Sequence, residues 1–274
     1  METIQFLICT IDDRIQLVQQ MLMTPSEGVC YLVSWQQSEE WQQKISDSSK
    51  AESIYVADFL NKRQDVQVTP CSGKGLSKNR NNALSQATGD LLIIADDDCR
   101  YSEQSIQTIR KAFLEFPDTT LMQFQGIDFN GKFIHPYANY SYEYHNRPYG
   151  AYFSSWELVV RRTENLPKFD ERFGIGAYLG CGEEEVFVHQ IAEKGLKVRY
   201  VPEIIVTTQP ATTGTQFATN IKVRRAKGAV SYILNGYVGA ILRCFKFALK
   251  LKRNRLKSFI DMYNGITYIR NGRK

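Results

Sequence analysis

The stretch "GLSKNRNNALSQATGDLLIIADDD", residues 75–98, decides the fold. Its first part, residues 75–90, predicts a helix that ends near Gly89, and "LLIIA" (91–95) then predicts a buried central strand. Three carboxylates, at residues 96–98, follow the strand directly. Because like charges repel and loss of solvent raises their cost, we expect positive charge to lie among them.

Short apolar stretches alternate with helical patterns elsewhere in the first two thirds of the chain. Strands that alternate with helices predict an α/β fold with a mainly parallel sheet. In such sheets ligands bind at the carboxyl ends of the strands, which is where the three carboxylates lie. The further strand candidates are residues 3–10, 28–35, 53–59, 66–70 and 196–206.

Length and composition predict a globular protein with a substantial core. The chain has 274 residues, of which 43% are hydrophobic. Its six cysteines are scattered without a C-x-x-C pair, which favours free thiols in a reducing compartment over a disulfide or zinc framework. The first residues lack the basic and apolar pattern of a signal peptide, and no stretch is apolar enough to span a bilayer. We therefore expect a cytoplasmic location.

The net charge of +5 hides an asymmetry along the chain. Residues 204–274 hold 14 Lys and Arg but only one acid, Asp261, whereas residues 1–203 hold 20 basic and 28 acidic residues. This split predicts an acidic-leaning body followed by a basic tail for an anionic surface. The sequence changes character after Thr207, so we expect two domains, 1–210 and 211–274.

Asp96 and Asp98 form a D-x-D pair at the end of the predicted strand. Carboxylate oxygens suit Mg²⁺ or Mn²⁺, which keep coordination positions open for a diphosphate. The alternative is a solvated acidic turn. Three acids directly after a buried strand favour the metal–nucleotide interpretation.

A second motif, "GCGEEEVFVHQIAEKG" (180–195), predicts a helix that begins at Glu183. Acids in a first turn suit the helix dipole, so capping explains at least one glutamate. A partly buried glutamate could instead act as a general base towards a hydroxyl. The residues alone leave both interpretations open.

A third motif, "GKGLSKNRNNAL" (73–84), places Lys78 and Arg80 near the start of a helix. Either side chain could reach a nucleotide phosphate or base there, or lie on a solvated helix face. The glycine spacing fits neither a Walker loop nor a dinucleotide fingerprint.

In this order the motifs resemble glycosyltransferase family 2, the nucleotide-sugar-dependent enzymes with the GT-A fold. The resemblance rests on residues 75–98 and on "FDERFGIGAYLGCGEEEVFVHQIAEKGLKVRYVP" (169–202), and covers about residues 3–206. The Gly-Glu-Glu variant is similar to bacterial transferases that build capsule, O-antigen or other surface polysaccharides.

The resemblance implies roles for individual residues. Asp96 would contact the ribose or a metal, and Asp98 would ligate the divalent ion, Mn²⁺ or Mg²⁺, that holds the UDP diphosphate. Glu184 falls at the position of the catalytic base, with Glu183 as its neighbour. The base would take the proton of the acceptor hydroxyl as its oxygen attacks the anomeric carbon with inversion.

The resemblance also implies a nucleotide pocket and an acceptor side. Trp156 and Glu157 would lie on the acceptor side, although a core tryptophan is nearly as compatible with the pattern. The nucleotide pocket would comprise Thr10, Asp12, Arg14, Ser34, Gln36, Lys78, Arg80, Asp96 and Asp97.

Three departures from the family pattern affect these roles. The base position usually carries Asp, so Glu183 stays a candidate beside the longer Glu184. The second strand, "LVSWQQ" (32–37), lacks the Asp that usually reads the base. No His follows the last strand, so metal ligation would rest on Asp98, the diphosphate and water.

The basic tail predicts amphipathic helices. Its apolar residues recur at roughly helical spacing with Lys and Arg between them, a pattern that fits the interface of an anionic membrane, where each basic residue contributes about 1 kcal/mol. The alternative is a helix packed on the rest of the protein or on another subunit. A nucleic-acid partner is disfavoured because no binding motif accompanies the charge. The apolar residues are Ile241, Leu242, Phe245, Leu249, Leu256 and Phe259.

Together these patterns predict an inverting glycosyltransferase at the cytoplasmic membrane face that acts on a lipid-linked precursor of a bacterial surface polysaccharide. Two alternatives remain. A nucleotidyltransferase would use the same metal and nucleotide, and a non-catalytic member of the fold would bind glycan or scaffold an assembly.

Overall fold

The computed structural model describes residues 1–43, 48–209, 213–251 and 253–272. The chain divides into two compact units, each with its own core. The predicted domain boundary near residue 210 falls outside the described residues and stays a prediction. The first unit comprises Met1–Lys74, Lys78–Lys168 and Gln190–Pro210, and the second comprises Gly75–Ser77, Phe169–His189 and Ala211–Lys274.

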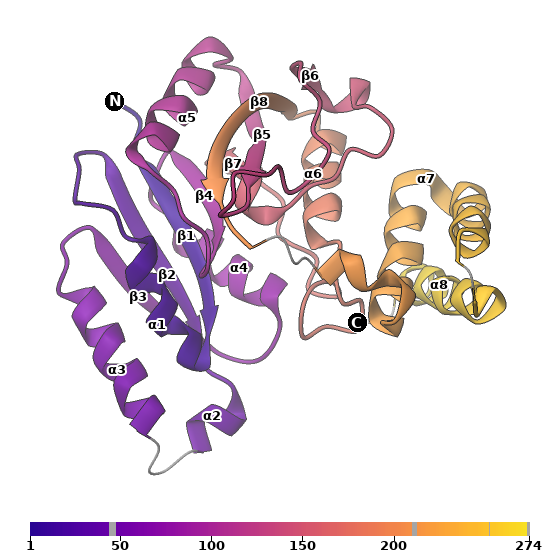
Figure 1. The fold of residues 1–274 in the computed structure, drawn as a ribbon, viewed down its shortest axis with the longest axis horizontal. Helices are drawn as coiled ribbons and strands as arrows, with labels where there is room; N and C mark the ends of the chain where they lie inside the picture. Colours follow the sequence, from indigo (N-terminus) through magenta and orange to yellow (C-terminus); the bar gives the residue numbers. More distant parts are fainter. Residues whose placement is uncertain (44–47, 210–212, 252, 273–274) are drawn as a thin grey trace. The chain divides into compact units, whose positions relative to one another are not determined.

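The first unit is built on a sheet that has eight strands in the described part of the chain (Figure 1). The strand order is β3-β2-β1-β4-β7-β5-β8-β6. Strands β3, β2, β1 and β4 run parallel, as do β5 and β8, whereas β7 lies antiparallel between β4 and β5. This arrangement confirms the predicted α/β fold with a mainly parallel sheet. The strands are β1 (Ile4–Ile11), β2 (Val29–Gln36), β3 (Val66–Cys71), β4 (Leu91–Asp96), β5 (Thr119–Ile127), β6 (Tyr142–Glu143), β7 (Leu158–Arg161) and β8 (Lys197–Thr207).

Helices connect these strands and form most of the second unit. The predicted helix over residues 75–90 ends at Gln86, three residues earlier than expected. The α-helices are α1 (Ile15–Val18), α2 (Glu39–Gln43), α3 (Ser48–Asn61), α4 (Leu76–Gln86), α5 (Glu103–Glu115), α6 (Glu183–Glu193), α7 (Ile221–Leu249) and α8 (Arg255–Arg270).

The prediction of a strand at residues 53–59 is wrong, because this segment lies inside α3. Its buried residues are Ser53, Val56, Ala57 and Leu60. They recur every three or four positions, which is the period of a helix face rather than the two-residue period of a strand. Exposed aromatic and β-branched side chains between them gave the segment the composition of a strand.

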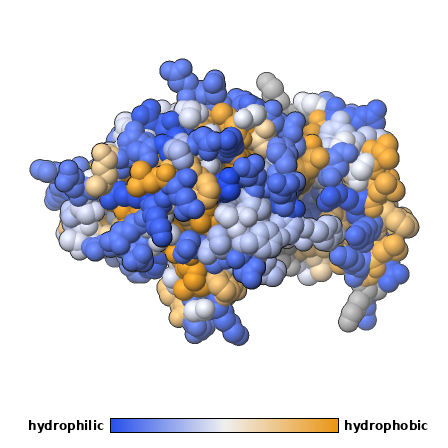
Figure 2. All heavy atoms as spheres, turned by 90° about the horizontal axis from the view of Figure 1, so that it is seen from above, coloured by the Kyte–Doolittle hydropathy of each residue, from blue (hydrophilic) through white to orange (hydrophobic). Residues whose placement is uncertain are grey.

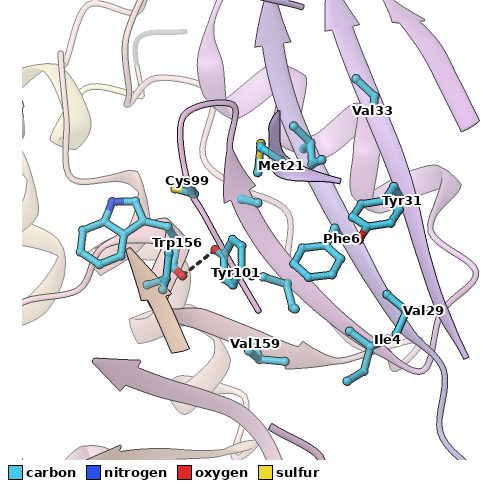
Figure 3. Close-up of a cluster of buried hydrophobic side chains, with 14 of the residues drawn as sticks. Ile4, Phe6, Met21, Val29, Tyr31, Val33, Cys99, Tyr101, Trp156 and Val159 are labelled. Atoms are coloured by element: carbon cyan, nitrogen blue, oxygen red, sulfur yellow. Dashed lines mark hydrogen bonds between the residues drawn. The ribbon is translucent and has the colours of Figure 1, made fainter. Parts of the chain in front are cut away.

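The core of the first unit lies against the parallel strands. β4 is buried along its whole apolar run, as expected for a parallel strand covered on both faces. Phe6 on β1 stacks on Tyr31 of β2 with ring centroids 4.9 Å apart and meets Tyr101 edge-on (Figure 3). The Tyr101 hydroxyl donates a hydrogen bond of 2.8 Å to the carbonyl of Trp156. This bond ties the segment before β7 to the core.

Strand β7 places the segment before it beside the end of β4. The two strands are antiparallel, with Ile93 opposite Val159. The short 3-10 helix η4 (Ser155–Glu157) precedes β7 directly, so it lies near the carboxyl end of β4. No sequence pattern predicted β5, β7 or α5.

The second unit contains the C-terminal helices α7 and α8, which pack closely on each other. A Cβ added at Gly228 would lie 1.9 Å from the carbonyl oxygen of Met262, and one added at Gly265 would lie 1.9 Å from that of Arg225. Glycine at these two positions therefore permits a backbone-to-backbone approach of the two helices. The helices are also joined by a buried hydrogen bond of 2.8 Å, which the Arg224 Nε donates to Asp261, the one acid in residues 204–274.

No helix within the described ranges combines the length and the apolar character needed to cross a membrane.

Replacing Gly228 by Ala tests this close packing. The new methyl group must push α8 away, so we expect the free energy of unfolding to fall by about 2 kcal/mol or more. Arg243→Ala, at an exposed position of the same helix, should change it by less than about 0.5 kcal/mol. Urea unfolding followed by circular dichroism compares the two. Equal stability of both variants would show that the helices do not approach as described.

Candidate functional site

Three carboxylates lie at the carboxyl end of β4. Asp96 is the last residue of the strand, and Asp97 and Asp98 lie in the turn that follows. Cys9 of the parallel neighbour β1 lies opposite Asp96, so the residues after β1 reach the same edge of the sheet. Two arginines of the first unit supply the positive charge expected there.

The first of these, Arg80 on α4, pairs with Asp96. Its side chain is only 2% exposed, and its Nη2 donates hydrogen bonds to Asp96 Oδ1 at 3.0 Å and to Ser155 Oγ at 2.7 Å. The Ser155 hydroxyl donates in turn to Asp96 Oδ2 at 3.2 Å. Arg80 thus holds Asp96 from inside the protein, where a buried guanidinium requires a paired carboxylate. Its predicted contact with a nucleotide stays a prediction.

The second arginine, Arg14, pairs with Asp97. Its Nε donates to Asp97 Oδ2 at 3.0 Å, and its Nη2 donates to Oδ1 of the same carboxylate. The Thr10 hydroxyl also donates to Asp97 Oδ2, at 2.7 Å. Burial raises the pKa of Asp97, while the hydrogen bonds from Arg14 and Thr10 oppose that shift. The same pairing raises the pKa of Arg14, so the guanidinium keeps its charge.

Asp98 is the most exposed of the three acids. Its side chain is 43% exposed, against 33% for Asp96 and 4% for Asp97, and its Oδ2 lies 3.4 Å from Arg14 Nη2. In the part of the chain that the structure describes, no three His, Cys, Asp or Glu side chains gather into a metal centre. Asp96 and Asp98 can therefore offer a hard cation carboxylate oxygens, with substrate and water oxygens needed to complete its shell.

Asp12 connects the ends of β1 and β2. Its carboxylate accepts hydrogen bonds from the Ser38 backbone N–H (2.7 Å) and hydroxyl (2.8 Å), and its carbonyl accepts from the Trp35 indole (2.9 Å). Its φ of 50° lies in a region that residues other than glycine rarely adopt. Strained residues held by several contacts cluster at functional sites. This geometry is compatible with the predicted place of Asp12 beside the nucleotide.

The remaining predicted nucleotide-pocket residues differ in exposure. Ser34 and Gln36 on β2 are buried, and the Ser34 hydroxyl accepts a hydrogen bond of 2.8 Å from Asn82. Lys78 is partly exposed, and its ammonium lies over Gly73, where an added Cβ would come within 2.5 Å of Nζ. Of these three side chains, Lys78 is thus the one that can present charge to a ligand.

Glu157 lies completely buried in a polar cluster beside η4. Its carboxylate accepts hydrogen bonds from the Tyr137 hydroxyl and, at 2.8 Å, from Gln123 Nε2 on β5. Burial raises the pKa of Glu157 to about 8. His135 Nε2 lies 3.8 Å from the same carboxylate, and burial lowers the pKa of this imidazole to about 4. The cluster joins the loop after β5 to the segment before β7.

Trp156 is a core residue with one aromatic neighbour in that loop. The residue is 6% exposed, and a Cβ added at Gly126 would lie 2.3 Å from a carbon of its ring. His135 stacks nearly parallel to it at 6.0 Å and lies 4.8 Å from the Tyr152 ring. Trp156 thus takes the core position that the sequence allowed as an alternative. The predicted acceptor contacts of Trp156 and Glu157 stay predictions.

Glu183 and Glu184 begin α6 in the second unit. Glu183 is buried, and an added Cβ at Gly174 would lie 3.3 Å from its carboxyl carbon and 3.1 Å from Ser77 Oγ. Glu184 is partly exposed. Of the two, Glu184 has the solvent access that proton transfer to a substrate requires, whereas Glu183 packs against the Gly174 turn.

Some residues of the site were missed by sequence reasoning. Ser155 and Ser38 are ordinary serines that carry no motif, and only the fold brings them to Asp96 and Asp12. Glu157, the only acid within the apolar stretch "FSSWELVV" (153–160), was predicted on the acceptor side, but its burial in a polar cluster was not predicted. Its partner Gln123 had no signal, whereas Tyr137 begins a tyrosine-rich stretch (137–152) whose composition favours an acceptor loop.

Comparisons with known proteins bear on the family and the fold of the chain. Residues 45–170 match the sequence model of the family described as Glycosyl transferase family 2. No curated protein matches the chain. Among solved structures, S. aureus TarS 1-349 is similar at a TM-score of 0.61 and 15% identity, over 98% of this chain and 82% of that one. Its complex with UDP gives a TM-score of 0.58 at 14% identity, over 99% and 92%.

A second solved structure is similar to the chain along its length. It is the mannosyltransferase PcManGT from Pyrobaculum calidifontis in complex with GDP-Man and Mn²⁺, with a TM-score of 0.52 and 11% identity over 98% of this chain and 88% of that one. At such identities these likenesses establish the fold, which is GT-A.

The buried Glu157 predicts a pH dependence of stability. Its pKa is raised in the folded state, so the folded protein binds a proton that the unfolded chain releases, and stability falls as pH rises towards 8. The lowered pKa of His135 acts in the opposite direction, but only below about pH 6.5. Between pH 6.5 and 8.5, Glu157 should therefore cost about 2 kcal/mol.

Glu157→Gln should remove most of this loss, because the amide cannot ionise. Exposed Glu164→Gln serves as the matched control and should keep the wild-type slope. Urea midpoints at the two pH values give the measurement. A wild-type slope in Glu157→Gln would mean that Glu157 is already ionised at pH 6.5.

Proposed function

Because its sequence match and its fold identify the chain as a family 2 glycosyltransferase, we propose that it transfers a sugar, with inversion, from a UDP-sugar to a glycan hydroxyl. The observation that carries the proposal is the carboxylate group at the end of β4. Asp97 is neutralised by Arg14 and Asp96 by Arg80, while Asp98 stays exposed.

The donor diphosphate would lie at the carboxyl ends of β1 and β4. Arg14 is half exposed, so the guanidinium that holds Asp97 can also face a phosphate oxygen. The TarS complexes with UDP and UDP-GlcNAc support a uridine nucleotide, and PcManGT with GDP-Man shows that the fold also accepts guanosine. Because β2 does not end in an acid, the identity of the donor's nucleobase is tested by experiment below.

A divalent ion fits this edge of the sheet. Asp98, and the Asp96 oxygens not used by Arg80 and Ser155, offer hard oxygen ligands, and PcManGT was solved with Mn²⁺. Bound there, Mn²⁺ or Mg²⁺ would neutralise charge on the departing diphosphate. Arg14 would add a second positive charge at the same place.

Glu184 would remove the proton of the acceptor hydroxyl. It is the partly exposed glutamate at the start of α6, whereas Glu183 is buried. As the hydroxyl oxygen attacks the anomeric carbon, its proton passes to the Glu184 carboxylate and the bond to the diphosphate breaks. The attack from the opposite face inverts the anomeric configuration.

The acceptor in this proposal is a lipid-linked precursor of a bacterial surface polysaccharide, such as a capsule or O-antigen. The basic C-terminal helices support it, because such an acceptor requires an enzyme at the inner face of the membrane. Two alternative functions have to be excluded, that of a nucleotidyltransferase and that of a non-catalytic glycan-binding protein.

A donor panel tests the function. Protein with Mn²⁺ or Mg²⁺ is mixed with UDP-, GDP-, dTDP- and CMP-sugars, and slow donor hydrolysis and thermal shift are measured. We expect a metal-dependent UDP-sugar hit that Asp98→Asn weakens at least tenfold, while exposed Asp58→Asn leaves it unchanged. Released pyrophosphate would indicate a nucleotidyltransferase, and no hit in folded protein would favour the non-catalytic alternative.

Exchange of each glutamate tests the base. Glu184→Gln should keep the affinity for the donor and lower the rate of transfer at least about 100-fold, because the amide cannot accept a proton. Glu193→Gln at the far end of α6 is the control. If Glu184→Gln transfers sugar at the wild-type rate, and Glu183→Gln loses transfer at unchanged stability, the base is Glu183 instead.

A further inference from the structure

The outer part of α7 turns its large apolar side chains away from the protein. Gly236, with φ of 67° and ψ of −176°, interrupts the helix, and a separate segment of α7 follows it. In this segment the small residues Ala240, Cys244 and Ala248 are buried against Met262 and Ile266 of α8. The fully buried positions of the segment are thus small residues, and the larger Ile241 and Phe247 pack beside them partly buried.

The large apolar residues form a stripe on the exposed side of the same segment. Val238, Leu242, Phe245 and Leu249 are spaced by three or four positions, which places them along one line of the helix. Their side chains are between 50% and 72% exposed. We call these four residues the outer stripe. Figure 2 shows hydrophobic surface over the C-terminal helices. Monomeric proteins rarely leave such a line of large apolar residues without a partner.

Basic residues flank the outer stripe on one side. Arg243, Lys246 and Lys250 lie three or four positions apart and form an adjacent line on the same helix. The nearest acid in sequence, Asp261, is buried against Arg224. The exposed side of this segment therefore combines apolar surface with positive charge.

We propose that the outer stripe and its basic flank dock on the surface of an anionic lipid bilayer. The helix would lie in the interface plane, with Leu242 and Phe245 among the acyl chains and the Lys and Arg stems reaching to phosphate headgroups. Charge complementarity favours anionic lipid over a second copy of this chain. Residues 204–274 hold 14 basic residues and one acid, so the same segments of two copies would repel each other. The inference does not depend on the sugar-transfer reaction.

Vesicle sedimentation tests the proposal. The full chain is mixed with vesicles of phosphatidylcholine alone or with added phosphatidylglycerol, at low and high salt. We expect binding to the anionic vesicles that weakens with salt, because the basic flank is screened. The double variant Leu242→Ser/Phe245→Ser should lower the partition coefficient at least tenfold at either salt concentration. Leu114→Ser, at an exposed leucine of α5 in the first unit, should bind as wild type does.

A charge variant separates the two parts of the surface. Arg243→Gln/Lys246→Gln/Lys250→Gln should bind weakly and lose the salt dependence. Each variant replaces exposed side chains, so unfolding midpoints close to wild type verify that the fold is kept. Absence of wild-type binding to anionic vesicles, or equal binding by the serine double variant, would overturn the proposal. A concentration-dependent dimer that the double variant abolishes would assign the stripe to a second copy instead.

Discussion

Two arginine–aspartate pairs at the end of β4 are the interaction on which the site depends. Three adjacent carboxylates could not lie at a partly buried strand end without positive charge beside them. The buried Arg80 on α4 supplies positive charge to Asp96, and Arg14 in the turn after β1 supplies it to Asp97. Because the protein itself pairs Asp96 and Asp97 with arginines, Asp98 is left as the most exposed acid of the three.

The sheet order explains how these groups meet. β1 and β4 are parallel neighbours, so Thr10 and Arg14 come to the aspartates from one side. β7 lies antiparallel on the other side of β4, and Ser155 in the short helix before it hydrogen-bonds to Asp96. The next residues of the same short helix carry the buried Glu157, whose partners lie on β5 and its loop. The position of β7 between β4 and β5 thus connects the three carboxylates at the end of β4 to the loop after β5.

The sequence predicted the elements whose signal is local. A buried strand that ends in three acids, the helix before it and the glutamate helix all have patterns that neighbouring residues define. Residues 53–59 were assigned to a strand because their composition outweighed their helical spacing. Contacts between distant residues, such as Ser155 with Asp96 or Arg14 with Asp97, depend on strand order, which no local pattern contains. The sequence therefore indicated that positive charge was needed but not which side chains provide it.

The crossing of α7 and α8 has a consequence for how the protein can evolve. Glycines at 228 and 265 and the small residues of the inner face hold the two helices together by backbone proximity, so the large side chains outside contribute little to folding. Natural variation is therefore expected to be narrow on the inner face and wide on the outer one. The affinity and selectivity of the outer surface can then change from one lineage to the next while the carboxylate site and the helix pair stay unchanged.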